Sequence, residues 1–342
     1  MTRFYDEAKQ HQIKWRSTQL AHLPELGIHA GRRYPHLLPS DHWLQGLFPP
    51  IRDRLKEYLA AYWIQPHSHK HNLLSSWILC ANMYFPFRGN PAGLDLLTGF
   101  LASKLGTRGR NVENIELEYS LDPPLDASTL LGESGGRRGA SQTSPDVAFE
   151  LSKGAEKALV LTECKYIEAS FSGCSGYSKS DQKLRGRPAN PDRERCHQSA
   201  NVIGDPEHFC HLTVWDRRYW EYLAPIADRG AFRNLEYCPA RSSGYQLLRE
   251  YTYAQALFES GRYEKVIYAI AWDQRNEALT RSMRRVGIVD IESGWQSLFP
   301  RGVSIKTWSH ADWVDHVESH GGAQWSAWVE YVRARYGWPR TS

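Results

Sequence analysis

The sequence predicts an α/β protein with a mixed central sheet of about four core strands, flanked by helices and elaborated by helices at both ends. Strands are expected where residues alternate between apolar and polar or form a short apolar run, at 112–121, 146–151, 159–166 and 264–272. Amphipathic segments of helical period stand before and between these strands, at 93–106 and 242–260. Helices and strands in this order fold as layers around a sheet.

The composition is that of an ordinary globular chain, with 41% hydrophobic and 23% charged residues among 342. The net charge of +4 is only mildly basic, so charge alone indicates no nucleic-acid partner. No run of eighteen apolar residues is present and the start Met1–Trp15 is polar, so neither a membrane span nor a secretory signal is expected. Six cysteines are too few for a disulfide scaffold, which favours a reduced, cytoplasmic protein.

Three regions are expected along the chain. They are a mostly helical N-terminal region packed on the core at 1–90, the core at 91–275 with a long insertion at 169–240, and a helical C-terminal region at 276–342. Residues 72–84 are apolar all round, which predicts a buried helix. His67, His69 and His71 alternate just before it. No Cys or carboxylate accompanies them, so a polar loop is favoured over a metal site.

The segment after the strand at 112–121 is rich in Pro, Gly and Ser and predicts a flexible loop up to Ser144. Arg137 and Arg138 lie in this loop. They are either ordinary solvated residues or contacts for phosphate groups, and the sequence favours neither.

The two strands at 146–151 and 159–166 predict a hairpin centred near Gly154 and Ala155. In that register Asp146 lies opposite 163 or 164, which puts it beside Glu163, with Lys165 one pleat further on the same face. Opposed carboxylates repel each other across a sheet. A divalent cation between them would remove that repulsion, so the hairpin predicts a metal site.

This hairpin resembles the PD-(D/E)XK nuclease superfamily, with Pro145-Asp146 as the first half of the motif and Glu163-Cys164-Lys165 as the second. The resemblance implies that Asp146, Glu163 and the backbone carbonyl of Cys164 bind Mg²⁺, with Mn²⁺ able to substitute. It implies that Lys165 positions the attacking water and stabilises charge on the phosphate. Many members carry a further acid, for which Glu118 is the candidate.

A second, narrower resemblance covers the segment HNLLSSWILCANMYFPF, which is similar to the start of a group of candidate restriction endonucleases in the same superfamily. Its polar residues are expected to cap and pack the helix at 72–84 more than to line a site; they are Asn72, Ser75, Ser76 and Asn82.

Together these resemblances imply a Mg²⁺-dependent deoxyribonuclease, an endonuclease of restriction or phage-defence type that hydrolyses phosphodiester bonds. Two alternatives stay open: a degenerate nuclease fold that binds nucleic acid without cleaving it, and RNA as the substrate. A homodimer would suit cleavage of both strands.

The helix at 242–260 is expected to begin with a capping box, Ser243-x-x-Gln246. In the superfamily the equivalent helix packs beside the active site and offers a polar side chain to it, for which Gln246 is the catalytic candidate and Arg249 a candidate contact for nucleic acid. The helix and the strand at 264–272 complete the superfamily's order of elements. Residues 273–342 are expected to form short helices.

The insertion holds four cysteines: Cys174, Cys196, Cys210 and Cys238. Some members of the superfamily hold an iron–sulfur cluster through scattered cysteines, and zinc is the other metal that four cysteines suit. No C-x₂-C pair is present, and cysteines are often simple buried apolar residues. A reduced, packed set is therefore favoured over a structural metal.

Overall fold

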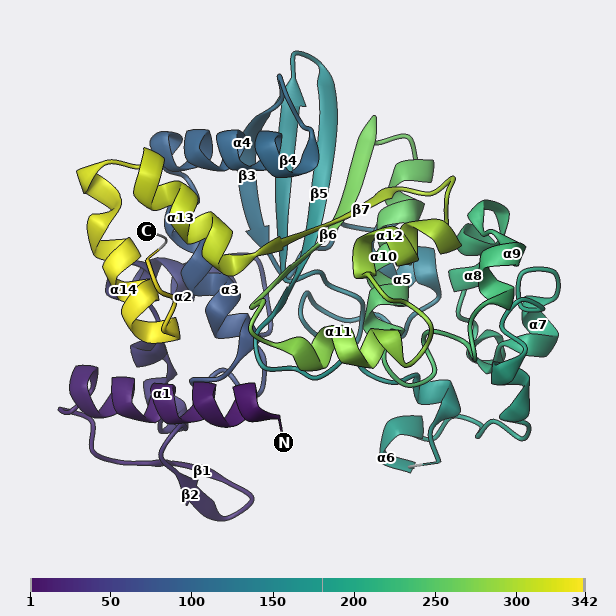
Figure 1. Ribbon diagram of the computed structural model, residues 1–342, viewed down its shortest axis with the longest axis horizontal. Coiled ribbons are helices and arrows are strands. Elements are labelled where there is room, and N and C mark those ends of the chain that lie inside the picture. Colours follow the sequence, from purple (N-terminus) through teal and green to yellow (C-terminus); the bar gives the residue numbers. More distant parts are fainter. Residues whose placement is uncertain (1, 180, 341–342) are drawn as a thin grey trace.

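A five-stranded mixed sheet forms the centre of the computed structural model, which describes residues 2–179 and 181–340 (Figure 1). Its strands, in spatial order, are β3 (Asn111–Leu117), β4 (Val147–Lys153), β5 (Glu156–Lys165), β6 (Lys265–Trp272) and β7 (Ser304–Ser309). The pairs β3–β4 and β4–β5 are antiparallel, whereas the pairs β5–β6 and β6–β7 are parallel. The predicted α/β class with a mixed sheet is confirmed.

The β4–β5 hairpin has the predicted register. Lys153 pairs with Glu156 and Val147 pairs with Thr162, so the hairpin turns at Gly154 and Ala155, and Asp146 lies next to Glu163 in the continuation of the ladder. Side chains alternate between the two faces of the sheet as expected from the period of two. Phe149 belongs to the core on one face and Ala148 to the core on the other.

One face of the sheet is covered by helices from both ends of the chain (Figure 1). They are α1 (Arg3–Gln19), α2 (Arg52–Ala61), α3 (Ser76–Tyr84), α4 (Pro91–Leu105), α13 (His310–His320) and α14 (Ser326–Tyr336). The apolar segment expected at 72–84 becomes α3, of which every residue from Trp77 on is buried. Ser75 is its N-cap, and Asn82 bonds to Gly46 and Tyr336, so these two residues cap and pack as expected.

The other face carries α5, the insertion and the helices that follow it (Figure 1). These helices are α5 (Ala127–Leu131), α6 (Asp181–Leu184), α7 (Pro206–Phe209), α8 (Tyr219–Leu223), α9 (Arg229–Arg233), α10 (Tyr245–Glu259), α11 (Glu277–Arg284) and α12 (Ile291–Leu298). A small two-stranded sheet, β1 (Gly27–His29) and β2 (Arg32–Tyr34), lies outside both layers. Among the described residues, no helix combines the length and the apolar character needed to cross a membrane.

Three local expectations were wrong. The region 273–342 contains a strand as well as helices, because Ile305 and Trp308 on β7 bury one side chain on each face of the sheet. Strand β3 ends at Leu117 instead of 121, because the backbone of Glu118 turns to a positive φ of 49°. The capping box is not formed, because α10 begins after Gly244 and no side chain caps it.

Candidate active site

Three side chains meet where the end of β5 lies close to the start of α10. Lys165 Nζ donates hydrogen bonds to Glu163 Oε1 at 2.7 Å and to Gln246 Oε1 at 2.6 Å. Gln246 Nε2 donates to the same Glu163 Oε1 at 2.7 Å. Glu163 and Lys165 are only 2% and 5% exposed. The predicted catalytic residues of the strand and of the helix therefore form one closed triangle.

Asp146 lies just before β4 and is half-buried beside this triangle. Its Oδ2 accepts a hydrogen bond from the Cys164 backbone N–H at 2.9 Å, which fixes the carboxylate against β5. Desolvation and the negative charge of Glu163 raise the pKa of Asp146 well above its usual range. A carboxyl group in this environment gains from a cation that favours its charged form.

Glu118 lies next to Asp146 because its backbone N–H donates to the Asp146 carbonyl at 2.9 Å. The side chain is 3% exposed, so it does not lie on a solvated strand face. Burial raises the pKa of Glu118 to about 8, and the charge of Glu163 adds to the shift. The positive φ at this residue directs it away from the ladder, and the candidate third acid thus joins the other two carboxyl groups.

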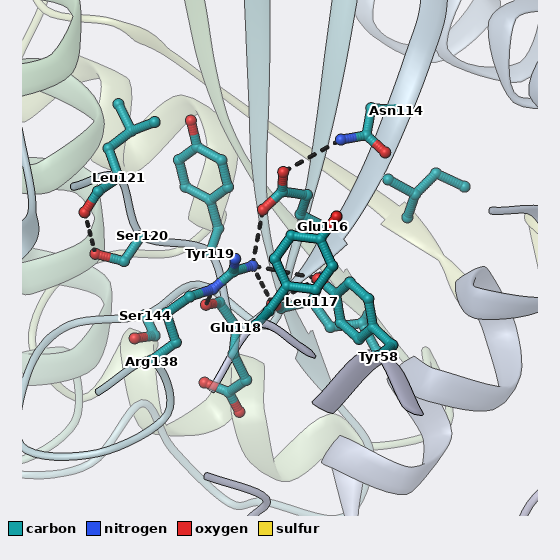
Figure 2. A network of polar contacts seen from close by, with 12 residues as sticks. Tyr58, Asn114, Glu116, Leu117, Glu118, Tyr119, Ser120, Leu121, Arg138 and Ser144 are labelled. Carbon is teal, nitrogen blue, oxygen red and sulfur yellow. Dashed lines mark hydrogen bonds and ion pairs between the residues drawn. The ribbon is translucent and has the colours of Figure 1, made fainter. Parts of the chain in front are cut away.

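The loop after β3 is held in place by the guanidinium of Arg138 (Figure 2). Its Nη2 lies 2.8 Å from Glu116 Oε2 and donates to the Leu117 carbonyl at 2.7 Å and to Tyr58 Oη at 3.2 Å. Its Nε donates to the Glu118 carbonyl at 2.8 Å. Arg138 thereby fixes the backbone at the point where Glu118 leaves the strand.

The next residue in this loop packs directly on the acid. A side chain at Gly139, which has a φ of +77°, would place its Cβ 2.5 Å from the Gln65 carbonyl oxygen and 3.3 Å from the Glu118 carboxyl group. Only glycine fits that position. The Gly-rich loop therefore forms one wall beside Glu118, which its composition alone did not indicate.

The positive charge of Lys165 is secured by its surroundings. Burial lowers the pKa of its ammonium group, but the negative charges of Glu163, Glu168 and Asp146 outweigh burial and raise the pKa above its usual value. Lys165 is consequently an ammonium ion at neutral pH. A cation at this place can stabilise negative charge that develops on a neighbouring phosphate.

Two carboxylate oxygens of the cluster are buried without a hydrogen-bond partner. Among the described residues, Glu163 Oε2 and Glu118 Oε1 are both buried and unpartnered, an arrangement that is costly unless a further group binds them. Mg²⁺ takes one or two protein carboxylates and keeps several waters. In the described part of the chain, no group of three or more His, Cys, Asp or Glu side chains has the geometry to hold a metal ion.

The other predicted contacts lie in different places. Arg137 is exposed, donates from Nε to Gln65 Oε1 at 3.1 Å and lies 5.4 Å from the ring centre of Trp63, which is itself 68% exposed. Arg249 lies away from the triangle, 3.9 Å from Glu133 and over the Tyr245 ring. Both guanidinium groups thus have protein partners, and only Arg137 is fully open to solvent.

One residue near the site was not recognised from the sequence, and another was assigned only to a polar loop. Glu250 is buried on α10 and accepts a hydrogen bond from Tyr268 Oη at 2.9 Å, and burial together with the charge of Glu163 raises its pKa well above the usual range. It stands four positions after Gln246, a helical spacing that could have revealed it. His67 is the second: burial lowers its pKa, and Glu163 counteracts the shift. No signal in the sequence connects that loop with β5.

All four cysteines of the insertion line a single cavity on the α10 side of the sheet. They are free thiols and half-buried. The sequence singled out these four cysteines, and the structure brings them together.

A protein-family model described as "Restriction Endonuclease associating with ARP" matches residues 9–337. The chain belongs to this family. The match includes every residue of the cluster around Glu163, and it confirms the resemblance to a restriction endonuclease group inferred from the segment 71–87, which contains α3. No curated protein and no solved structure was found to match the chain.

Proposed function

We propose that this member of the family is a Mg²⁺-dependent DNA endonuclease with a PD-(D/E)XK core. The observation that supports the proposal most is the division of Glu163 between two environments. Its Oε1 is bound by Lys165 and Gln246, while its Oε2 is buried and unpartnered. A purely structural carboxylate would have partners for both oxygens.

In this proposal each residue has a separate task. Asp146 and Glu163, with the Cys164 carbonyl and with Glu118 as the further acid, hold Mg²⁺ or Mn²⁺. The bound ion supplies a Lewis acid and lowers the pKa of water. Lys165 orients the attacking water and stabilises charge on the phosphate, and Gln246 holds Lys165 and Glu163 in position.

The family name supports restriction as the role, and phage defence in the cytoplasm is the setting in which restriction acts. A homodimer would bring two sites to the two strands of DNA. The second candidate function, a nuclease fold that binds nucleic acid without cleaving it, is disfavoured because Asp146, Glu163 and Lys165 are all present. Lys165 is hydrogen-bonded to Glu163, and Asp146 is fixed to Cys164, the residue between them.

The test is cleavage of supercoiled plasmid DNA by the purified protein in Mg²⁺, in Mn²⁺ and in EDTA, with structured RNA as a parallel substrate. We expect cleavage of DNA in either metal and none in EDTA. Glu163→Ala and Lys165→Ala should each lose at least about 100-fold of the rate while keeping the fold, since removing a preorganised charged group from a catalytic site costs that much.

Lys157→Ala, on the exposed turn end of β5, is the matched control and should cleave normally. Near-normal cleavage by both site variants would rule out this cluster as the nuclease site. Metal-independent DNA binding with no cleavage by the wild type would favour the binding module instead.

A further inference from the structure

The four cysteines that line the cavity come from distant parts of the insertion. Cys174 follows β5, and Cys196 and Cys210 lie in the middle of the insertion. Cys238 lies shortly before α10. The other two cysteines, Cys80 and Cys164, are buried in the core on the opposite face of the sheet. A general tendency of cysteine to be buried explains those two, but it does not explain why all four others converge on one cavity.

Backbone hydrogen bonds hold the cysteine segments against one another. Cys238 N–H donates to the Cys196 carbonyl at 2.8 Å, and Cys174 N–H donates to the Ala240 carbonyl at 2.9 Å. The helical elements of the insertion are short, none longer than five residues. The cysteine segments are therefore held together by backbone contacts between short elements and not by one long helix.

The cavity also carries positive charge that suits thiolate ligands. A bound metal would deprotonate the four thiols. Arg195 and Arg241 line the same cavity, where they would balance the resulting negative charge.

From this convergence we infer that Cys174, Cys196, Cys210 and Cys238 hold an iron–sulfur cluster. Four thiolates suit either zinc or such a cluster. A single zinc ion requires its ligands to converge on one point, and among the described residues no three such side chains do so. A cluster takes each thiolate on its own iron atom, so its ligands surround a cavity. Apolar walls from Val202, Leu212 and Leu248 would shield it from water.

The cluster would fasten the insertion to α10. Leu248 of that helix lines the cavity, and the chain before Cys174 is tied to the start of α10 by hydrogen bonds from Phe171 N–H to the Ser243 carbonyl at 2.7 Å and from Gln246 N–H to the Phe171 carbonyl at 2.8 Å. The role of the cluster is structural, and the inference does not depend on the proposed nuclease function.

The test is purification of the full chain under anaerobic conditions, followed by quantification of iron, acid-labile sulfide and zinc, and by a visible absorption spectrum. We expect iron and sulfide in comparable amounts, a visible charge-transfer band, and loss of both on exposure to a chelator and an oxidant. Thermal unfolding should then begin at a lower temperature, because a bound metal centre contributes folding free energy.

Cys238→Ser should lose most of the iron, whereas Cys80→Ala, a change at a buried cysteine outside the cavity, should keep it. If Cys238→Ser does not fold, the metal content and the bleaching of the wild type still decide the matter. Stoichiometric zinc without iron, or a protein free of metal whose unfolding temperature the chelator leaves unchanged, would overturn the inference. Iron retained at the wild-type level in Cys238→Ser would do so as well.

Discussion

Glu163 is the residue on which the other side chains of the site depend. Lys165 and Gln246 both bind one of its oxygens, and Lys165 also binds the Gln246 amide oxygen, so the three groups can only move together. Because the amide both donates and accepts, it fits between an ammonium and a carboxylate. Neither a carboxylate nor an amine at position 246 could make both contacts.

We therefore predict that Gln246→Ala slows cleavage by about 10- to 100-fold, the usual cost of removing a group that orients a metal ligand. The protein should stay folded, and more Mg²⁺ should be needed for half-maximal rate. Steady-state cleavage rates across a Mg²⁺ titration measure both effects.

Gln255→Ala provides a control for general damage to α10. Gln255 is buried on the same helix and accepts from Val303 N–H at 2.9 Å, away from the site. The Gln255→Ala change should lower the free energy of unfolding and leave the cleavage rate of the folded protein unchanged. A Gln246→Ala protein that cleaves as fast as Gln255→Ala would show that the triangle has no role in positioning.

His310 is fully buried at the start of α13, where its Nε2 lies 3.2 Å from the Lys165 carbonyl and its Nδ1 has no partner. Burial lowers its pKa from 6.5 to about 4, although Asp273, the Lys165 carbonyl and Glu168 oppose the shift. Between these two values the unfolded chain binds more protons than the folded one. The free energy of unfolding should therefore be intact above pH 6.5 and fall with acid, by up to about 1.4 kcal/mol per pH unit.

Urea unfolding between pH 7 and pH 4.5 tests this linkage. In His310→Gln, whose amide can still donate to the carbonyl, the loss of stability with acid should be smaller than in the wild type. His22→Gln, at an exposed position, should show the wild-type dependence. An equal acid dependence in all three proteins would mean that His310 does not contribute.

At the scale of elements, the strands of the core were the most predictable part. The alternation in β4 and the apolar run in β5 specified both the hairpin and its register, because a shift by one residue would have moved every core side chain to the wrong face. The location of Gln246 beside β5 also followed from the order of elements, in which the helix at 242–260 precedes the strand at 264–272. What the sequence could not give was the departure of Glu118 from β3, since that turn depends on Arg138, which is twenty residues further along the chain.

Strand β7 was missed for a related reason. It is six residues long, and Lys306 and Thr307 interrupt its apolar pattern. Its position at the edge of the sheet leaves Lys306 free to pair with Glu292. Edge strands need fewer apolar residues than central ones, so periodicity is a weaker signal for them.

Two neighbouring arginines of the loop after β3 give opposite predictions. Arg138→Ala removes four contacts that hold the strand end, and it leaves Glu116 without its ion pair. The free energy of unfolding should fall by at least about 2 kcal/mol, since hydrogen bonds to charged groups are worth 1.5–3 kcal/mol each. Arg138→Lys should fail to restore it, because an ammonium cannot reproduce the fork of the guanidinium.

Arg137→Ala should leave the stability unchanged and weaken DNA binding, because its exposed guanidinium is open to phosphate. The slope of log affinity against log salt should decrease by about one. Urea unfolding and a binding titration in EDTA, carried out on both variants, measure the contrast. Equal binding by Arg137→Ala and wild type would remove this loop from the nucleic-acid interface.

At the scale of the molecule, the candidate site joins the end of β5 to the start of α10 and to the chain that leaves β3. The N- and C-terminal regions are packed together on one face, where Gln12 Nε2 donates to the Arg335 carbonyl at 2.7 Å, and the insertion covers the other. The net charge of +4 gives little long-range attraction for the DNA proposed as the substrate. Local charge at the site, including its carboxylates, therefore matters more for binding than the overall charge.

Asp146→Asn separates binding from chemistry at this scale. Asparagine keeps an oxygen for the Cys164 N–H but removes one negative charge from the proposed metal site. Mg²⁺ binding depends on carboxylate charge, so cleavage should fall by at least about 100-fold. Phosphate is also anionic, so in EDTA the variant should bind DNA as tightly as the wild type or more tightly, with the same steep fall in affinity as salt increases.

Binding titrations in EDTA at two salt concentrations, beside cleavage in Mg²⁺, test both halves of this prediction. Glu150→Gln is the matched control. Glu150 lies on β4, four residues after Asp146 and on the same face, but it is hydrogen-bonded by Asn114 away from the cluster. It should cleave and bind like the wild type. Normal cleavage by Asp146→Asn would mean that Asp146 does not hold the metal. Loss of DNA binding in EDTA would instead mean that the contact of Asp146 with Cys164 shapes the binding surface. The removal of one negative charge cannot by itself weaken binding to an anion.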